Sequence, residues 1–355
     1  MTNKNIYLFA NLKMIAIYVN IMWSYWELLI LTRKRLNFRR DRDRMSHTYI
    51  HTYIHTYIHT CVKKLANAYR KWNAEKPERY YIIDGFNMDL GEGHGLQLIQ
   101  KYNPMYDRFV PYLGRIADAK NIPNAVMVDI GANVGDTVAA FIKHTKSNVI
   151  CVEPTRKFYN LCRKNIDGFG HDYSGRISLI NAYVSDIETT GFISEVIDGT
   201  AIKRTTVSGA EAPTYTLPHI VDQCGYNMNQ LSVIKIDTDG YDADCIFSLG
   251  EELRGISPVI FWENQIDEIS QHEKYVSMGS FLYESGYNDF FVFDNYGNYL
   301  CHTDKNGYIE INNYIKRMLN KKSTRSFFYV DVLAAKIPDV EICHKAIEDY
   351  LHKYD

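Results

Sequence analysis

The sequence predicts an α/β fold, in which a doubly wound, mostly parallel sheet of seven strands carries helical additions at its N-terminal side. Two observations predict this class. From residue 126 onward, apolar runs of strand length alternate with amphipathic runs of helix length. The strands are continuously apolar, which indicates a parallel sheet covered by helices on both faces. In such a sheet a ligand binds at the carboxyl ends of the strands, where the strand order reverses.

The expected elements follow in order along the chain. A short helix at 62–72, a short strand at 80–83, a Gly/Asp-rich loop at 85–95 and a helix at 104–120 precede the sheet. The seven strands are 126–130, 149–153, 177–184, 231–237, 258–263, 289–294 and 327–335. The helices between them are 136–145, 154–167, 241–253 and 268–285, where apolar residues recur at helical spacing. The insertion at 186–230 reads partly as hairpin strands and is expected to cover the site.

The first 60 residues differ from the rest of the chain. Residues 47–60 read HTYIHTYIHTYIHT, a repeat that suits neither a strand nor a sustained helix face. Residues 14–31 form an apolar run that contains Glu27, and a basic stretch follows at 33–44. A membrane anchor with a cytosolic main domain is therefore the alternative to a cytoplasmic protein. We expect 1–60 to be a leader outside the core, disordered or not native, 61–125 a helical lead-in, 126–335 the main domain and 336–355 a C-terminal helix.

Composition and charge restrict the class of function. With 355 residues, 46% of them hydrophobic, the chain can bury the core of one large α/β domain. The residues after residue 60 carry 31 Lys and Arg against 39 Asp and Glu, so we expect no nucleic-acid partner. The seven cysteines are scattered and no pair has CxxC spacing, so we expect reduced thiols and no metal site.

The strongest local signal is VDIGANVGDT at 128–137, where an apolar strand turns through glycines into a helix. Glycines let the backbone approach a ligand closely, and a helix start offers free N–H donors. The glycines are spaced GxxxG, so the GxGxxG fingerprint of dinucleotide-binding enzymes is absent. The loop suits the carboxylate and amino group of a methionine moiety. Its cofactor-binding candidates are Asp129, Gly131, Ala132, Asn133, Gly135, Asp136 and Thr137.

A second signal, VICVEP at 149–154, ends the next strand with a carboxylate. Glu153 lies 22 residues after Gly131, which is the position where a carboxylate binds a ribose diol. Pro154 then begins the following helix at a position that proline tolerates. We include Glu153, Pro154 and Ala182, which lies in the third strand segment, among the cofactor-binding candidates.

A third signal, VIKIDTDGYDAD at 233–244, places acidic residues after a buried strand. Asp237 and Asp239 are expected at the mouth of the site, whereas Asp242 is expected to cap the helix that begins near Tyr241. Lys235 points to the opposite face from its neighbours Ile234 and Ile236, so it either pairs with these carboxylates or is structural. The DxD at 237–239 leaves open a divalent metal in a nucleotide-sugar transferase, although the glycine loop argues against it.

These three blocks, in this order, resemble the FkbM-type family of class I (Rossmann-like) methyltransferases. The lead-in YDRFVPYL at 106–113 and the later PVIFWEN are also similar, and the resemblance spans roughly residues 104–335. It implies S-adenosylmethionine as the cofactor and O-methylation of a hydroxyl on a sugar, glycan or small natural product. This chain departs from the family pattern at Asp239 and Asp242, where glutamate is usual.

Methyl transfer to a neutral hydroxyl requires a base beside the acceptor oxygen. The candidates are Asp237 and Asp239, with Lys235 and Glu263 as nearby support. His219 and His272 are weaker candidates, since a lone histidine on a loop or helix is more often an ordinary surface residue. Two other functions remain open: a binding protein on a methyltransferase fold that has lost catalysis, and the DxD glycosyltransferase.

Overall fold

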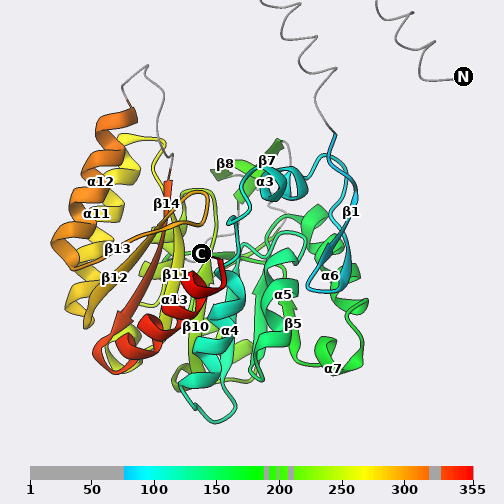
Figure 1. The fold of residues 1–355 in the computed structure, drawn as a ribbon, viewed down its shortest axis with the longest axis horizontal. Helices are drawn as coiled ribbons and strands as arrows, with labels where there is room; N and C mark the ends of the chain where they lie inside the picture. The colour runs from blue at the N-terminus through cyan, green and yellow to red at the C-terminus, as the bar shows by residue number, and fades with distance from the viewer. Residues whose placement is uncertain (1–75, 188–191, 198–199, 207–211, 320–328, 355) are drawn as a thin grey trace, which may run out of the picture. The chain divides into compact units, whose positions relative to one another are not determined.

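In a computed structural model of the chain, the described residues are 76–354 except 188–191, 198–199, 207–211 and 320–328 (Figure 1). The expectations for residues 1–60 and for a helix at 62–72 lie outside the described residues. No helix in the described part of the chain is long and apolar enough to cross a bilayer.

The centre of the molecule is a sheet whose order is β13-β12-β14-β11-β10-β3-β4-β5. Its strands are β3 (Val126–Ile130), β4 (Asn148–Val152), β5 (Ile177–Ile180), β10 (Leu231–Ile236), β11 (Val259–Gln265), β12 (Tyr287–Asp294), β13 (Tyr299–Thr303) and β14 (Tyr329–Lys336). The five strands from β5 to β11 are parallel, and β14 runs antiparallel to both β11 and β12. The doubly wound, mostly parallel sheet is thus confirmed. The strand order reverses between β3 and β10, so their carboxyl ends are the expected place for a ligand.

The sheet differs from the prediction at two places. Each predicted strand is present, but an additional strand, β13, pairs antiparallel with β12 at the edge. The segment predicted as one strand at 177–184 is divided, because β6 (Tyr183–Val184) leaves the sheet and pairs with β9 (Thr214–Tyr215). Asn181 stabilises this break, since its side-chain amide donates to the carbonyls of Glu153 and Pro154, each at 2.8 Å.

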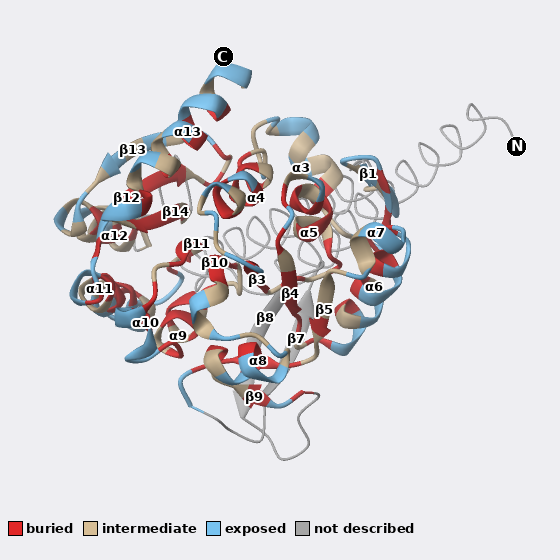
Figure 2. Ribbon diagram, turned by 90° about the horizontal axis from the view of Figure 1, so that it is seen from below, coloured by how far each residue is buried: buried red, intermediate tan, exposed pale blue. Residues whose placement is uncertain are grey.

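Helices cover both faces of the sheet (Figure 2). One face carries α4 (Val110–Ala119), α5 (Asp136–Phe141), α6 (Arg156–Asp167) and α13 (Val340–Tyr354). The other face carries α8 (Leu217–Gln223), α9 (Asp242–Phe247), α10 (Glu252–Gly255), α11 (Ile269–Glu284) and α12 (Lys305–Leu319). Side chains alternate along each strand, so that Met127 and Val233 pack on the first face while Val128 and Ile234 pack on the second.

The helix boundaries correct several predictions. The helix expected at 104–120 begins only at Val110, and the helix expected at 241–253 is divided into α9 and α10. The helix expected at 136–145 ends as the 3₁₀ turn η1 (Ile142–His144). The helix α12 and the short elements α7 (His171–Ser174), η2 (Met228–Gln230) and η3 (Ile337–Asp339) were not predicted. Within the insertion, β7 (Phe192–Ile197) and β8 (Thr200–Thr206) form an antiparallel pair, as expected for a hairpin.

A small N-terminal unit lies beside the glycine loop. It begins with the predicted strand β1 (Tyr80–Ile83), which forms a hairpin with β2 (Phe86–Asp89), a strand inside the segment predicted as a loop at 85–95. The helix α3 (Leu96–Tyr102), which was not predicted, follows the hairpin. Asp89 anchors the hairpin: it accepts two hydrogen bonds from the Arg79 guanidinium, at 2.8 and 2.9 Å, and one from Lys164. The Asn165 side chain donates to the carbonyls of Asp89 and Val134, which ties the hairpin to the loop after β3. These bonds place the unit over the carboxyl edge of the sheet.

Candidate active site

The loop after β3 packs against the end of β10. The backbone N–H groups of Gly131 and Ala132 both donate to the carbonyl of Val152, at 2.9 and 3.1 Å. Gly131 has φ +82°, and a Cβ atom there would collide with the backbone carbonyl oxygen of Asp237. Only glycine therefore fits this position, because a side chain would separate the two strand ends at the switch point.

The second half of the loop leads into α5. Gly135, at φ +85°, precedes the helix and lies against Cys162 of α6. Ala132 is buried, while Asp136 and Thr137 line a cavity above the sheet edge. The candidates on this loop are thus brought to one place.

Glu153 lies at the carboxyl end of β4 and is 4% exposed. Its two carboxylate oxygens accept hydrogen bonds from the backbone N–H groups of Asn133, at 2.9 Å, and of Thr155, at 2.7 Å. Each oxygen has a second lone pair, so the carboxylate can still accept hydroxyl donors from a ligand. Glu153 therefore joins the glycine loop to the next strand end.

A small cavity of about 50 Å³ opens beside Glu153. It is lined by Gly131, Asn133, Glu153, Pro154, Thr155, Phe158, Tyr183, Asp237, Thr238 and Asp239. Ala182 is fully buried, and the adjacent Tyr183 lines the cavity in its place.

Lys235 lies on β10 between two carboxylates and is 5% exposed. Its Nζ is 3.5 Å from Asp129 Oδ1 and 3.2 Å from Asp237 Oδ2, the pairing that the strand alternation suggested. Burial raises the pKa of Asp129 to about 6. The lysine charge opposes that rise, since an adjacent cation favours the ionised carboxylate.

A larger cavity of about 390 Å³, the main cavity, extends from Gly131 and Asn133 towards β11 and β14. Five carboxylates line it: Asp107, Asp136, Asp237, Asp239 and Glu263. Burial raises the pKa of Glu263 well above its ordinary value, and the neighbouring Asp237 and Asp239 add to the rise. Glu263 therefore holds its proton to a higher pH than an exposed glutamate does.

The sequence analysis missed several residues that line the main cavity. Tyr106 and Tyr329 are hydrogen-bonded to each other through their side chains, and both line the cavity with Asp107 and His94. Tyr106 and Asp107 fall in the YDRFVPYL segment, whose similarity to the family could have indicated them as site residues. Tyr329 begins β14, whose return next to β11 no local pattern predicts.

The two candidate histidines line none of these cavities. His219 is exposed on α8 and stacks on the Tyr215 ring, with centroids 4.5 Å apart. His272 is buried on α11, where its Nε2 is 3.0 Å from Asn313 Oδ1 and its Nδ1 is 3.3 Å from Lys316 Nζ. Their positions favour the structural interpretation for both.

The prediction that Asp242 caps a helix is wrong. Asp242 is the first residue of α9, its side chain makes no capping hydrogen bond, and it is fully buried. Its Oδ2 instead accepts hydrogen bonds from the hydroxyls of Thr238, at 3.2 Å, and Tyr275, at 3.3 Å. The Tyr275 hydroxyl is also 3.3 Å from the Glu263 carbonyl. Asp242 therefore links Thr238, in the loop after β10, to Tyr275 of α11.

The stability of the protein should depend on pH through Asp242. Burial, with a contribution from Asp237, raises its pKa from 3.8 to about 7 in the folded state. Between these values the folded state holds a proton that the unfolded state has released, so stability present at low pH is lost as the pH rises. Asp242→Asn cannot ionise, so its melting temperature should fall less than that of the wild type between about pH 5 and about pH 8. Parallel melting curves for the two proteins across this range would contradict the assignment.

The strand order, the glycine loop after the first strand and the carboxylate after the second define a Rossmann-like fold of the class I methyltransferase type. Residues 129–288 match the family model of the methyltransferase FkbM domain. No curated protein gives a significant match.

The solved structures that match this chain include several methyltransferases. The plantazolicin methyltransferase in complex with a triazolic desmethyl analogue and S-adenosylhomocysteine is 8% identical over 68% of this chain and 89% of its own, with a TM-score of 0.36. A methyltransferase from Aquifex aeolicus that depends on S-adenosylmethionine is 10% identical over 67% and 96%, with a TM-score of 0.33. An O-methyltransferase from Thermotoga maritima is 9% identical over 63% and 64%, also with a TM-score of 0.33.

The family implies S-adenosylmethionine, and the residues present fit it. Gly131 and Asn133 line the cavity beside Glu153, so the backbone of the glycine loop borders the space that a ligand would occupy. The Glu153 carboxylate borders the same cavity and retains acceptor capacity for ribose hydroxyls. The loop residues Asn133, Asp136 and Thr137 would then face the methionine end from the main cavity.

Replacement of Glu153 by alanine should weaken binding of S-adenosylhomocysteine by at least about tenfold. Each hydrogen bond to a charged acceptor contributes about 1.5–3 kcal/mol, and a loss of about 1.4 kcal/mol corresponds to a tenfold loss of affinity. Calorimetric titration measures this. Asp118→Ala is the matched control, since Asp118 also accepts a backbone hydrogen bond, from Lys146, but lies outside the cavities. Wild-type affinity in Glu153→Ala, with binding lost in Asp237→Ala and Asp239→Ala, would reverse the assigned roles.

Proposed function

We propose that this protein transfers the methyl group of S-adenosylmethionine to a hydroxyl oxygen of a sugar, glycan or small natural-product acceptor. One observation carries the proposal: the main cavity combines the backbone of the glycine loop with carboxylates from three neighbouring strand ends and loops. Methyl donor and acceptor can therefore meet in one space of about 390 Å³, which lies in the lower part of the range for small-molecule sites.

The cofactor supplies an activated methyl group when bound, and the protein supplies alignment and a base. Glu153 would hold the nucleoside end of the cofactor, and the loop at Gly131 and Asn133 would hold its methionine end. The acceptor hydroxyl would then face the carboxylates beyond Gly131. A site that holds both reactants in place makes the reaction effectively unimolecular, which lowers its barrier.

The base is one of the carboxylates at the far side of the main cavity. Asp237 accepts a hydrogen bond from Lys235, which orients it, and Glu263 has a pKa raised by burial and by Asp237. An aliphatic hydroxyl must lose its proton as it attacks, so one of these groups accepts that proton. Asp239, at φ +53°, is held in a left-handed conformation at the same edge of the cavity. We assign the acceptor proton to Asp237 and the supporting role to Glu263.

The family match favours methyl transfer over transfer of a sugar from a nucleotide, and it leaves a binding protein without turnover as the alternative. The experiment is incubation of the full chain with methyl-labelled S-adenosylmethionine and a panel of sugars and phenolic or aliphatic alcohols. We expect S-adenosylhomocysteine to be released and the label to appear on an acceptor oxygen. Tight cofactor binding without turnover on any acceptor would favour the binding protein, and label on nitrogen or carbon would contradict O-methylation.

A further inference from the structure

We propose that a second cavity next to the main cavity binds an oxyanion, carboxylate or phosphate, carried by the acceptor at a distance from its reacting hydroxyl. The inference rests on the proposed function, because it assigns the second cavity to part of the same acceptor. This second cavity measures about 210 Å³ and lies between α3, α4, α5 and the end of α13.

The two cavities share one wall. Leu96, Asp107, Asp136 and Thr137 line both of them, so the two spaces are adjacent. The main cavity must hold the methyl end of the cofactor as well as the reacting part of the acceptor. At about 390 Å³ it lies near the lower limit for ligand sites, so an acceptor with a further substituent needs additional room. The second cavity is the adjacent space.

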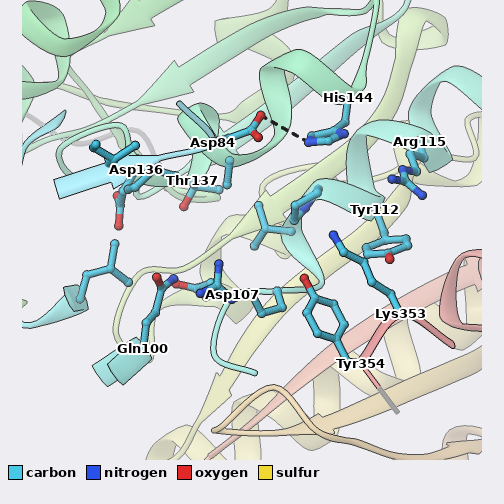
Figure 3. Close-up of a pocket in the computed structure, with 17 residues that line it drawn as sticks. Asp84, Gln100, Asp107, Tyr112, Arg115, Asp136, Thr137, His144, Lys353 and Tyr354 are labelled. Atoms are coloured by element: carbon cyan, nitrogen blue, oxygen red, sulfur yellow. Dashed lines mark ion pairs between the residues drawn. The ribbon is translucent and has the colours of Figure 1, made fainter. Parts of the chain in front are cut away.

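The two ends of the second cavity carry side chains of opposite charge (Figure 3). Asp136 and Thr137 lie at the end next to the main cavity, and Arg115 and Lys353 lie at the opposite end with the rings of Tyr112 and Tyr354. An anion would be repelled by the carboxylates of the main cavity and attracted to this opposite end. The charge pattern therefore orients an acceptor that carries an anion at one end and a hydroxyl at the other.

Arg115 and Lys353 have no carboxylate partner among the described residues. The Arg115 guanidinium lies 4.7 Å from the centroid of the Tyr112 ring, and Lys353 Nζ lies 5.2 Å from that of Tyr354. The other basic groups at this cavity are already engaged. His144 Nε2 is 3.4 Å from Asp84, and Arg108 donates to the Pro104 carbonyl at 3.1 Å. Two cations thus remain for a ligand.

The helices that present these two cations are held together. The Tyr112 hydroxyl of α4 donates to the Asp349 carbonyl of α13 at 3.2 Å, and the Tyr112 and Tyr350 rings meet edge to face with centroids 5.6 Å apart. Because Arg115 and Lys353 are one turn from these contacts, their backbone positions are set before a ligand binds. Preorganisation of this kind lowers the entropy lost on binding.

The test uses three probes, D-glucose, D-glucose 6-phosphate and D-glucuronate, titrated into the full chain saturated with S-adenosylhomocysteine. We expect the two anionic sugars to bind about fivefold more tightly than glucose, as expected for two partly exposed ion pairs. The double variant Arg115→Ala/Lys353→Ala should lose this preference. The control is Arg163→Ala/Lys305→Ala, which removes the same charge from two cations that also lie over tyrosine rings, at 5.5 and 4.3 Å, but outside the cavity.

Each outcome decides the proposal. A preference for anions that disappears in the first double variant but persists in the control supports it. A preference that persists in both, or no preference in the wild type, overturns it, and absence of binding by all three sugars also overturns it. Binding of S-adenosylhomocysteine is measured in the same samples. Its loss in the wild type would reject the proposed function, whereas retained binding with no anion preference rejects only the second cavity.

Discussion

Gly131→Ala is expected to abolish measurable binding of S-adenosylhomocysteine while the secondary structure is retained. The methyl group of alanine would occupy the position of the Asp237 carbonyl oxygen, and φ of +82° is unfavourable for any residue with a Cβ atom. The loop must therefore move away from β10, which displaces the backbone that faces both cavities. Calorimetric titration measures the loss, and circular dichroism with a melting curve measures the fold.

Gly170→Ala is the matched control for this variant. Gly170 has a similar positive φ, +86°, but a Cβ atom there would meet nothing within 4 Å. It therefore carries the backbone strain without the collision. We expect a lower melting temperature but normal affinity in Gly170→Ala. A folded Gly131→Ala protein that binds with wild-type affinity would remove the glycine loop from the cofactor site.

Asp237→Ala is expected to lower turnover by about a hundredfold or more, because a positioned base contributes about 10²–10⁴ to the rate. Because Asp237 acts mainly on the acceptor, the affinity for S-adenosylhomocysteine should change by less than about threefold. This is well below the tenfold change that corresponds to about 1.4 kcal/mol. The rate of S-adenosylhomocysteine release with an acceptor found in the screen measures the first quantity, and calorimetry measures the second.

Asp237→Asn distinguishes a base from a positioning residue. Asparagine retains an oxygen that can accept the hydrogen bond from Lys235, now 3.2 Å long, but it cannot take a proton at neutral pH. If Asp237 is the base, the asparagine variant is as slow as the alanine variant. Recovery of the rate in Asp237→Asn, together with a comparable loss in Glu263→Gln, would instead assign the proton to Glu263.

The fold was predictable where burial produces a simple pattern. Continuous apolar runs such as VMVDI identify central parallel strands, because both faces of these strands are buried. The edge strand β13 escaped this criterion, since its residues alternate between half-buried and exposed positions. The break between β5 and β6 was missed because one polar residue, Asn181, in a mostly apolar run does not reveal the tertiary hydrogen bonds that its side-chain amide makes.

The site was predictable where a motif occupies one segment. The glycine loop, Glu153 and Asp237 each follow a strand, so the topology of a parallel sheet brings them to one edge. Tyr329 and Asp107 reach the same cavity from distant segments, and no spacing relates them to the loop. Asp242 was misassigned because an acidic residue at a helix start is most often a cap. Its burial beneath α11 depends on the tertiary packing of Tyr275.

The most direct test of the central claim is calorimetric titration of S-adenosylhomocysteine into the full chain, with a nucleotide sugar and Mn²⁺ titrated in parallel. A site built on Gly131 and Glu153 predicts that one molecule of S-adenosylhomocysteine binds per chain and that the nucleotide sugar gives no heat. Saturable binding of the nucleotide sugar, with none of S-adenosylhomocysteine, would contradict the assignment of this site to methyl transfer.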